Sequence, residues 1–295
     1  MTTPLSFVRR MFVVAALFGL PANGGLAAEE PSAGQTISPL QASSQTMTGD
    51  ELFARVLEQN RVRDLRLRQY SAIRKYEVTN DKGKVYAEEM IQVEYRAPDR
   101  KTFITESEKG SKLVRDLVLK RLIESESETS SGRAHRDSSI KPANYEFNLL
   151  GEQDVGRHHC LVVEALPRRK DKYLFEGKIW IDREDYAITR IAGHPAKSPS
   201  FWITRADFVR SYQKIGEFWL PARDETLVHV RLNGTKVLTV DHRDYTINYA
   251  TDARKKGSSG GQNGTATRIS GVNANEFELT VQRNAMPAGW RTASE

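Results

Sequence analysis

Residues 217–239 read EFWLPARDETLVHVRLNGTKVLT, and this stretch decides the fold class. Asn233-Gly234 is the dipeptide most typical of a two-residue type I′ turn, and apolar residues alternate with polar ones on both sides of it. A two-residue loop would pair Val230 with Val237, and an apolar cross-strand pair favours that register. The stretch therefore predicts a long antiparallel hairpin.

The same alternation recurs in most of the segment from residue 67 to residue 248. The turn residues Asn80-Asp81-Lys82-Gly83, for example, separate two further alternating stretches. We expect about ten strands in one antiparallel sheet, following one another in chain order. Their expected ranges are 67–79, 84–96, 102–105, 144–150, 157–166, 175–182, 187–193, 201–212, 217–232 and 235–248.

Two segments have helical rather than strand periodicity. Thr48, with Glu51 three residues later, forms a capping box, and the helix that it opens should run to about Arg63. Ser111 is the expected cap of a second helix, which extends to Leu122. The predicted class is therefore α+β and mainly β: an open, strongly curved sheet of about 10–11 strands, with two or more helices over its concave face.

The two ends of the chain do not have this pattern. Arg9 and Arg10 precede ten apolar residues, Met11 to Leu20, and Ala27-Ala28 follows. Ten residues are too few to span a bilayer, so we expect a signal peptide over 1–28, with a membrane anchor as the alternative and the Sec or Tat route left open. Residues 29–47 should be a disordered leader, 48–248 the domain, and 249–295 a flexible tail to which Phe277, Leu279 and Val281 could add a strand.

Composition excludes several functional classes. One cysteine in 295 residues excludes an internal disulfide framework and CxxC zinc sites. The formal charge is 44 − 38 = +6, and it falls to +4 without residues 1–28, so nucleic acid is not the expected partner. The sequence contains no glycine-rich phosphate loop, GxSxG elbow or HExxH motif. We therefore expect no enzymatic activity and no cofactor.

Two polar clusters invite a chemical interpretation. In a strand, His158 and Cys160 point to one side and His159 to the other, so the three side chains cannot share a metal ion. Asp182 and Asp185 resemble paired acids, but the alternating ligands and central glycine of an EF-hand loop are missing. The expectation is a buried structural cysteine, a solvated turn and no metal.

Aromatic residues are crowded into the strands between 180 and 219. A curved sheet has a concave face that must be filled by helices or by a ligand, and two short helices leave room for an apolar cavity. An ordinary self-filled core is the alternative. The residues expected to line the cavity are Met90, Val93, Leu113, Leu117, Trp180, Trp202 and Phe208.

Three segments resemble a known family. Gly177-Lys178-Ile179-Trp180-Ile181-Asp182 and Ala187-Ile188-Thr189-Arg190-Ile191 look like the strand, turn and returning strand of the bacterial periplasmic lipoprotein carriers and receptors (LolA/LolB-like, RseB-type). Phe218-Trp219-Leu220-Pro221 is similar to distant members of that family. The resemblance covers about 48–248 and implies a half-barrel whose cavity takes up acyl chains. The arginine that gates the carrier's cavity has no counterpart here.

Two hypotheses follow from these observations. In the first, the chain is an exported periplasmic binding or carrier protein, with a lipid or an acylated protein as its ligand. In the second, it is an envelope-stress sensor or protein-interaction module whose core is filled by its own side chains and whose partner is an envelope protein. The mature chain contains no expected transmembrane segment.

Overall fold

A computed structural model describes residues 47–249 and 267–268, apart from 99, 121, 124–138, 172, 199–200, 202 and 232–233. The expected signal peptide, nearly all of the leader and the segment 277–281 lie outside the described residues. Among the described residues, no helix is both long and apolar enough to cross a membrane.

The first helix, α1 (Gly49–Arg66), begins at the predicted capping box. The Thr48 hydroxyl accepts from the Glu51 amide at 3.2 Å, and the Thr48 amide donates to the Glu51 carboxylate at 2.8 Å. At Gly49, a Cβ atom would lie 2.0 Å from the carbonyl oxygen of Phe147, so the start of the helix lies directly against a strand. The helix ends three residues later than predicted, at Arg66.

The second helical segment reaches its predicted end, because Lys120, Leu122 and Ile123 are still helical, but its middle part is a π-helix. Helix α2 (Lys112–Val114) continues as the π-helical turn η3 (Arg115–Leu119), and the Ser111 hydroxyl accepts from the Val114 amide at 3.4 Å. Val118 and Leu119 are buried against the sheet.

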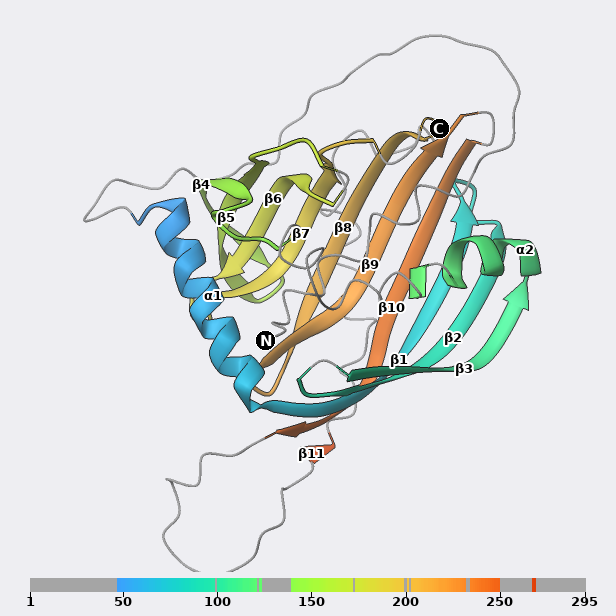
Figure 1. Cartoon of the computed structure of the whole chain (residues 1–295), viewed down its shortest axis with the longest axis horizontal. Helices are drawn as coiled ribbons and strands as arrows, with labels where there is room; N and C mark the ends of the chain where they lie inside the picture. Colours follow the sequence, from blue (N-terminus) through green and yellow to red (C-terminus); the bar gives the residue numbers. More distant parts are fainter. Residues whose placement is uncertain are drawn as a thin grey trace, which may run out of the picture.

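One antiparallel sheet forms the rest of the domain, which confirms the mainly β, open half-barrel prediction (Figure 1). Its ten main strands are β1 (Leu67–Asn80), β2 (Val85–Arg96), β3 (Arg100–Gly110), β4 (Tyr145–Val155), β5 (His158–Pro167), β6 (Phe175–Asp182), β7 (Ala187–Pro195), β8 (Ile203–Ile215), β9 (Phe218–Val230) and β10 (Gly234–Tyr249).

The strands do not lie in simple chain order, which corrects the prediction. The spatial order is β3-β2-β1-β10-β9-β8-β7-β6-β5-β4, so β1 pairs with β10 in the middle of the sheet. The two edges, β3 and β4, are consecutive in the chain but lie at opposite ends of the sheet. Local hairpin signals cannot reveal this arrangement, because the β1–β10 pairing joins segments far apart in sequence.

The β9–β10 hairpin exists, but its predicted register is wrong. Val230 pairs with Gly234 and Val237 pairs with Leu227, so three residues rather than two separate the paired strands. Gly234, the first paired residue after the loop, has φ of +66°, a left-handed conformation that favours glycine.

The expected flexible tail contains one short strand. β11 (Thr267–Arg268) pairs antiparallel with Ile247 and Thr246 of β10. This part of β10 is not paired with β9, because the last residue of β10 that pairs with β9 is Asp241. Within the described residues, the expected tail thus adds Thr267 and Arg268 to the sheet.

Two apolar clusters lie on one face of the sheet. Cross-strand partners share a face, and the partners Phe208, Thr226, Leu238, Val78 and Ala87 follow one another from β8 to β2. Phe208 belongs to the larger cluster, under α1, which we call the α1 cluster; its members include Leu52, Phe53, Val56, Phe147, Val163, Ile179, Ile191, Tyr212 and Trp219. The smaller one, under α2 and η3, is the η3 cluster: Tyr76, Val78, Ala87, Ile91, Val93, Val118, Leu119, Leu122, Leu238 and Val240.

The two helices cover different parts of this face. Figure 1 shows α1 beside β4 to β7 and α2 in front of β1 and β2. The main contacts agree: α1 packs on β4, β7 and the start of β1, whereas α2 and η3 pack on β2. Strands β8 to β10 lie between the two helices.

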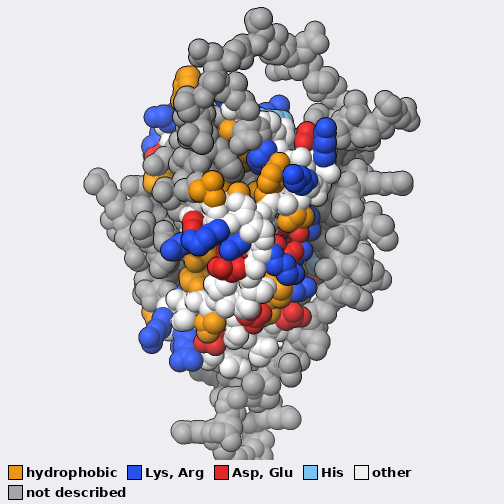
Figure 2. Space-filling view, turned by 90° about the vertical axis from the view of Figure 1, so that its right-hand side faces the viewer, with side chains coloured by type: hydrophobic (Ala, Val, Ile, Leu, Met, Phe, Trp, Pro, Cys, Tyr) orange, Lys and Arg blue, Asp and Glu red, His pale blue; other side chains and the backbone are white. Residues whose placement is uncertain are grey.

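The outer side near β3 is a mixed polar surface. Figure 2, which looks at this side of the molecule, shows basic and acidic side chains interspersed among the described residues. Lys75, for instance, lies 2.9 Å from Glu77 and 3.0 Å from Glu88, which also contacts Lys109 at 3.1 Å. Charges along an edge strand protect it from pairing with other chains.

Candidate functional site

The concave face between the two helices is the candidate site. Along one line of cross-strand partners, Ile179 and Ile191 of β6 and β7 are followed by Arg210 of β8, Asp224 of β9 and Val240 of β10. The face is thus apolar under α1 and becomes charged where neither helix has its main contacts.

Arg210 and Asp224 form a buried ion pair on this face. Arg210 Nε donates to Asp224 Oδ1 at 2.5 Å, and the two residues are only 2% and 6% exposed. His242 Nε2, on β10, lies 3.6 Å from Asp224 Oδ2. Burial alone would raise the pKa of Asp224, but the charge of Arg210 and the neighbouring His242 hold it well below its ordinary value. Asp224 is therefore ionised throughout the physiological range.

A second buried guanidinium lies beside this pair. Arg74 of β1 is the cross-strand partner of His242 and is 1% exposed. Its Nη1 donates to the Tyr76 hydroxyl at 3.4 Å, and its guanidinium carbon lies 5.7 Å from the centre of the Phe103 ring. An arginine side chain is rarely this buried, so Arg74 is stronger evidence for a functional site than the apolar residues around it. We call Arg74, Arg210, Asp224 and His242 the charged row.

Of the five predicted lining residues whose side chains the structure describes, two lie on the concave face. Phe208 is buried in the α1 cluster and Val93 in the η3 cluster. They are brought onto the same face but into separate clusters, because β8 and β2 are separated by three other strands.

The other described lining residues lie elsewhere. Trp180 packs with Cys160 and Val162 on the opposite face of the sheet, where Arg190 lies 4.9 Å from its ring centre. Met90 alternates with the buried Glu89 and Ile91, so it also points away from the η3 cluster.

The remaining lining residues are on or near the helical segment and β8. Leu113, in α2, is 66% exposed, so it does not line a buried surface. The side chain of Leu117 and the whole of Trp202 lie outside the described part of the structure. The predicted arrangement, with the second helix facing Trp180 across a pocket, is therefore wrong.

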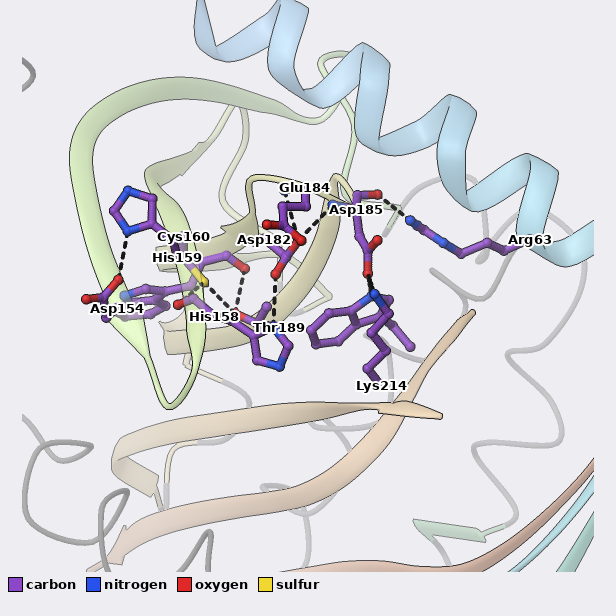
Figure 3. Close-up of polar contacts among 12 residues, drawn as sticks. Arg63, Asp154, His158, His159, Cys160, Asp182, Glu184, Asp185, Thr189 and Lys214 are labelled. Carbon is purple, nitrogen blue, oxygen red and sulfur yellow. Dashed lines mark hydrogen bonds and ion pairs between the residues drawn. The ribbon is translucent and has the colours of Figure 1, made fainter. Parts of the chain in front are cut away.

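The polar cluster of β5 and the β6–β7 turn stabilises local structure (Figure 3). Asp182 Oδ1 accepts from the amides of Glu184 and Asp185, at 3.0 and 2.7 Å, which closes the turn. Its other oxygen lies 3.0 Å from His158 Nδ1. These contacts confirm the turn but correct the expectation that it is solvated, because Asp182 is only 5% exposed.

His159 and Cys160 point to opposite sides of β5, as strand alternation predicted. His159 is half exposed and contacts Asp154 and Glu152, which raise its pKa. Cys160 is buried, and burial raises the pKa of its thiol to about 11, so it is not a thiolate at neutral pH. In the described residues, no group of three His, Cys, Asp or Glu side chains could hold a metal ion.

The β6–β7 turn also connects α1 to the sheet, through Asp185. The Arg63 guanidinium donates to the Asp185 carbonyl oxygen. The Asp185 carboxylate accepts from Trp219 Nε1 at 2.7 Å and lies 2.6 Å from Lys214 Nζ. Burial opposes ionisation of Asp185, but these two donors and Arg63 leave its pKa below the ordinary value. The contacts fix the position of α1 over the concave face.

The sequence interpretation did not include the charged row. A signal was present in the strand pattern: Asp224 shares its side of β9 with Thr226 and Val228, and His242 shares its side of β10 with Leu238 and Val240. A charge at an apolar position of an alternating strand is the feature that would have revealed these residues.

No family model matches the chain, and no curated protein matches it. Among solved structures, it is similar to an outer membrane lipoprotein-sorting protein domain from Vibrio parahaemolyticus, with 14% identity, a TM-score of 0.41, and coverage of 77% of this chain and 96% of the other. It is also similar to a LolA superfamily protein from Nitrosomonas europaea, with 9% identity, a TM-score of 0.32 and coverage of 68% and 93%.

A third similar structure is the MucA/MucB complex of Pseudomonas aeruginosa, with 12% identity, a TM-score of 0.24 and coverage of 66% and 93%. All three likenesses are distant, and the Nitrosomonas europaea protein carries the name of the LolA superfamily, to which the sequence resemblance pointed.

Proposed function

We propose that this chain is an exported, non-enzymatic binding or carrier protein for a lipid or acyl chain, and that it acts in the periplasm. The ligand lies on the concave face, over β8 to β10. One observation carries this proposal: these strands have apolar side chains on that face, while both described helices have their main contacts on other strands.

An acyl chain fits the chemistry of this surface. Phe208, Val228 and Leu238 lie on neighbouring strands of the concave face. Each methylene group transferred from water to such a surface contributes about 0.8 kcal/mol. An acyl chain long enough to reach from the α1 cluster to the η3 cluster would therefore bind through apolar contacts alone. The expected signal peptide agrees with an exported protein.

A second function, a sensor or protein-interaction module with a self-filled core, is favoured by a different observation. Phe208 is only 4% exposed and Val228 only 2%. Side chains that are already covered do not by themselves require a ligand. The two functions differ in what occupies the concave face of the purified protein, and this is measurable.

Native mass spectrometry of the full chain, purified from the fraction of the cell in which it accumulates, tests the proposal. We expect an adduct that organic extraction identifies as a lipid or fatty acid. In addition, a fluorescent fatty acid should bind with micromolar affinity and raise the melting temperature by mass action. A folded chain with neither an adduct nor any response to acyl ligands would instead support the sensor or interaction module.

A pair of variants localises the ligand. Phe208→Glu introduces a charge into the apolar part of the face and should abolish binding. Phe201→Glu is the matched control, because Phe201 is 72% exposed just before the same strand, and it should bind like the unaltered chain. Circular dichroism shows whether each variant is folded. Equal binding by two folded variants would exclude this face.

A further inference from the structure

We propose that the edge of β10 from Thr246 to Tyr249 is a docking site for an extended peptide segment of a partner protein, which adds to the sheet as a strand. In this structure the strand β11 of the chain's own tail lies on that edge, and the partner's segment replaces it. This inference goes beyond the proposed function, because it concerns the backbone of a strand rather than a ligand of the concave face.

The site exists because β9 and β10 separate. Their pairing ends at Arg223 and Asp241, although β9 starts at Phe218 and β10 continues to Tyr249. Over this stretch β10 stays paired with β1, up to the contact of Tyr249 with Leu67. Figure 1 shows β9 and β10 side by side in the upper part of the view and apart in the lower part. Among the described residues, only β11 pairs with the other edge of β10 here.

Two local features explain the separation. Pro221 of β9 has no amide hydrogen, and prolines inside sheets are confined to edges and bulges. Asp244 of β10 has a left-handed φ of +55°, at a bulge where the pairing with β1 shifts between Ser71 and Ile73. A bulge bends its strand and increases its twist. The separation is therefore determined by residues of both strands.

Side chains stabilise the point of separation. Gln213 Nε2, on β8, donates to the carbonyl oxygens of Pro221 and His242, at 3.1 and 3.3 Å. The Tyr245 hydroxyl donates to the Pro221 carbonyl oxygen at 2.9 Å. These side chains bind carbonyl groups next to the end of the β9–β10 ladder. Because none of these bonds involves β11, the edge keeps its shape when β11 leaves.

The tail strand occupies this edge through a short contact. Thr267 and Arg268 pair antiparallel with Ile247 and Thr246, and β10 extends two residues further. A longer peptide in the same register would form additional backbone hydrogen bonds along that edge. The advantage of the tail is that it belongs to the same chain, which raises its effective concentration. A longer segment of a partner therefore competes through its greater length.

The surroundings of the edge indicate the chemistry of the peptide. Phe218 and Leu220 of β9 and Ile247 of β10 belong to one buried apolar cluster. Alternate side chains of a strand point to the same face, so apolar residues at every second position of the peptide would extend this cluster. The nearby charges of Arg243 and Asp244 are 3.7 Å apart and balance each other. The expected partner segment is thus extended, uncharged and apolar at alternate positions.

Binding of a peptide to the full chain tests the site. The probe is a fluorescently labelled peptide of residues 264–271, which contain β11. In the double variant Thr267→Pro/Arg268→Pro, the tail lacks both amide hydrogens of β11. We expect this variant to bind the probe at least about tenfold more tightly than the unaltered chain does, because its tail no longer competes. The matched control, Thr267→Ala/Arg268→Ala, keeps the backbone groups and should bind like the unaltered chain.

Two results would overturn the proposal. One is that the proline variant does not bind the probe, and the other is that it binds no more tightly than the alanine variant. Circular dichroism shows that each variant is folded, which is expected because β11 lies outside the ten main strands. A probe peptide with proline at both β11 positions should not bind any of the three chains.

Hydrogen exchange locates the bound peptide. In the proline variant, a saturating concentration of the probe should slow exchange of the amides from Thr246 to Tyr249. Exchange in the segment from Val237 to Asp241, which is paired with β9, should not change. Protection confined to another part of the molecule, such as the edge strand β3, would exclude the edge of β10.

A second pair of peptides tests the chemistry of the partner. Both have eight residues with threonine at every second position and a lysine at each end, and the other positions are valine in one and glutamate in the other. The valine peptide should bind the unaltered chain at least about tenfold more tightly, which corresponds to about 1.4 kcal/mol. Equal binding would overturn the assigned chemistry. No lipid is involved, so a failure here leaves the proposed function untouched.

Discussion

The α1 cluster and the η3 cluster lie on the same face of one sheet, but they are built differently. The α1 cluster lies under an eighteen-residue capped helix and includes the Phe53 ring, stacked 3.6 Å from that of Phe147. Among the described residues, the η3 cluster has about half as many buried members, under a shorter helical segment with a π-helical middle part, beside the largely exposed edge strand β3. The comparison indicates that α1 stabilises the domain, while the η3 side is the more easily opened one.

The largest expected effect comes from emptying the α1 cluster. Phe53→Ala removes a fully buried ring and should lower the free energy of unfolding by about 3–5 kcal/mol. Urea unfolding followed by circular dichroism measures this change. Val62→Ala, at a 40% exposed position of the same helix, is the control and should change stability by less than about 0.5 kcal/mol.

The corresponding change on the η3 side should be smaller. Leu119→Ala removes a buried side chain and should cost about 2 kcal/mol, the low end for this substitution, because a short helical segment can settle into the space left behind. The same urea measurement applies, with the exposed Leu113→Ala as control. A loss as large as that of Phe53→Ala would mean that the two sides are equally important for stability.

The helix caps provide a finer comparison. Thr48→Ala removes half of a complete capping box and should cost about 1 kcal/mol. Ser111→Ala removes a longer, single hydrogen bond from a helix of three residues and should cost no more than about 0.5 kcal/mol. Melting temperatures of the two variants test the difference, and a reversed order would contradict the assignment of α1 as the stabilising helix.

The smallest expected effect depends on pH. The Thr48 amide and then its hydroxyl lower the pKa of Glu51 in the folded protein. A carboxyl whose pKa is lower when folded contributes stability above its unfolded pKa, and this is lost as the pH falls through the folded value. Glu51→Gln should therefore lower the melting temperature slightly at pH 7 and not at pH 3. The same loss at both pH values would show that the carboxylate charge has no role in the cap.

Local patterns predicted most elements of the fold but not their assembly. The Thr48 capping box and the alternating strands were predictable because each depends on neighbouring residues, and the open curved sheet was expected from the family resemblance. The β1–β10 pairing was not, and the hairpin register failed because the choice between a two-residue and a three-residue loop depends on how β9 and β10 pack. Periodicity shows which residues share a face, but not which strands are neighbours.

The candidate site was less predictable for the same reason. Phe208 and Val93 lie on the concave face, whereas Trp180 and Met90 lie on the other one, and whether Phe208 and Val93 line a ligand cavity stays a prediction. Aromatic residues were taken as the signal, yet both faces of this sheet bury apolar groups. Each residue of the charged row breaks the apolar pattern of its own strand, but that Arg74 and His242 are neighbours follows only from the strand alignment, since they are far apart in sequence.

The pairing of β1 with β10 also has a consequence for the time course of folding. Leu67 is the partner of Tyr249, so this contact cannot form until almost the whole domain has been synthesised. Pairings between distant segments slow folding. The edge of β1 therefore stays unpaired until β10 has been synthesised. The sheet is thus expected to be completed late, when β1 pairs with β10 and Arg74 comes to lie beside the other three residues of the charged row.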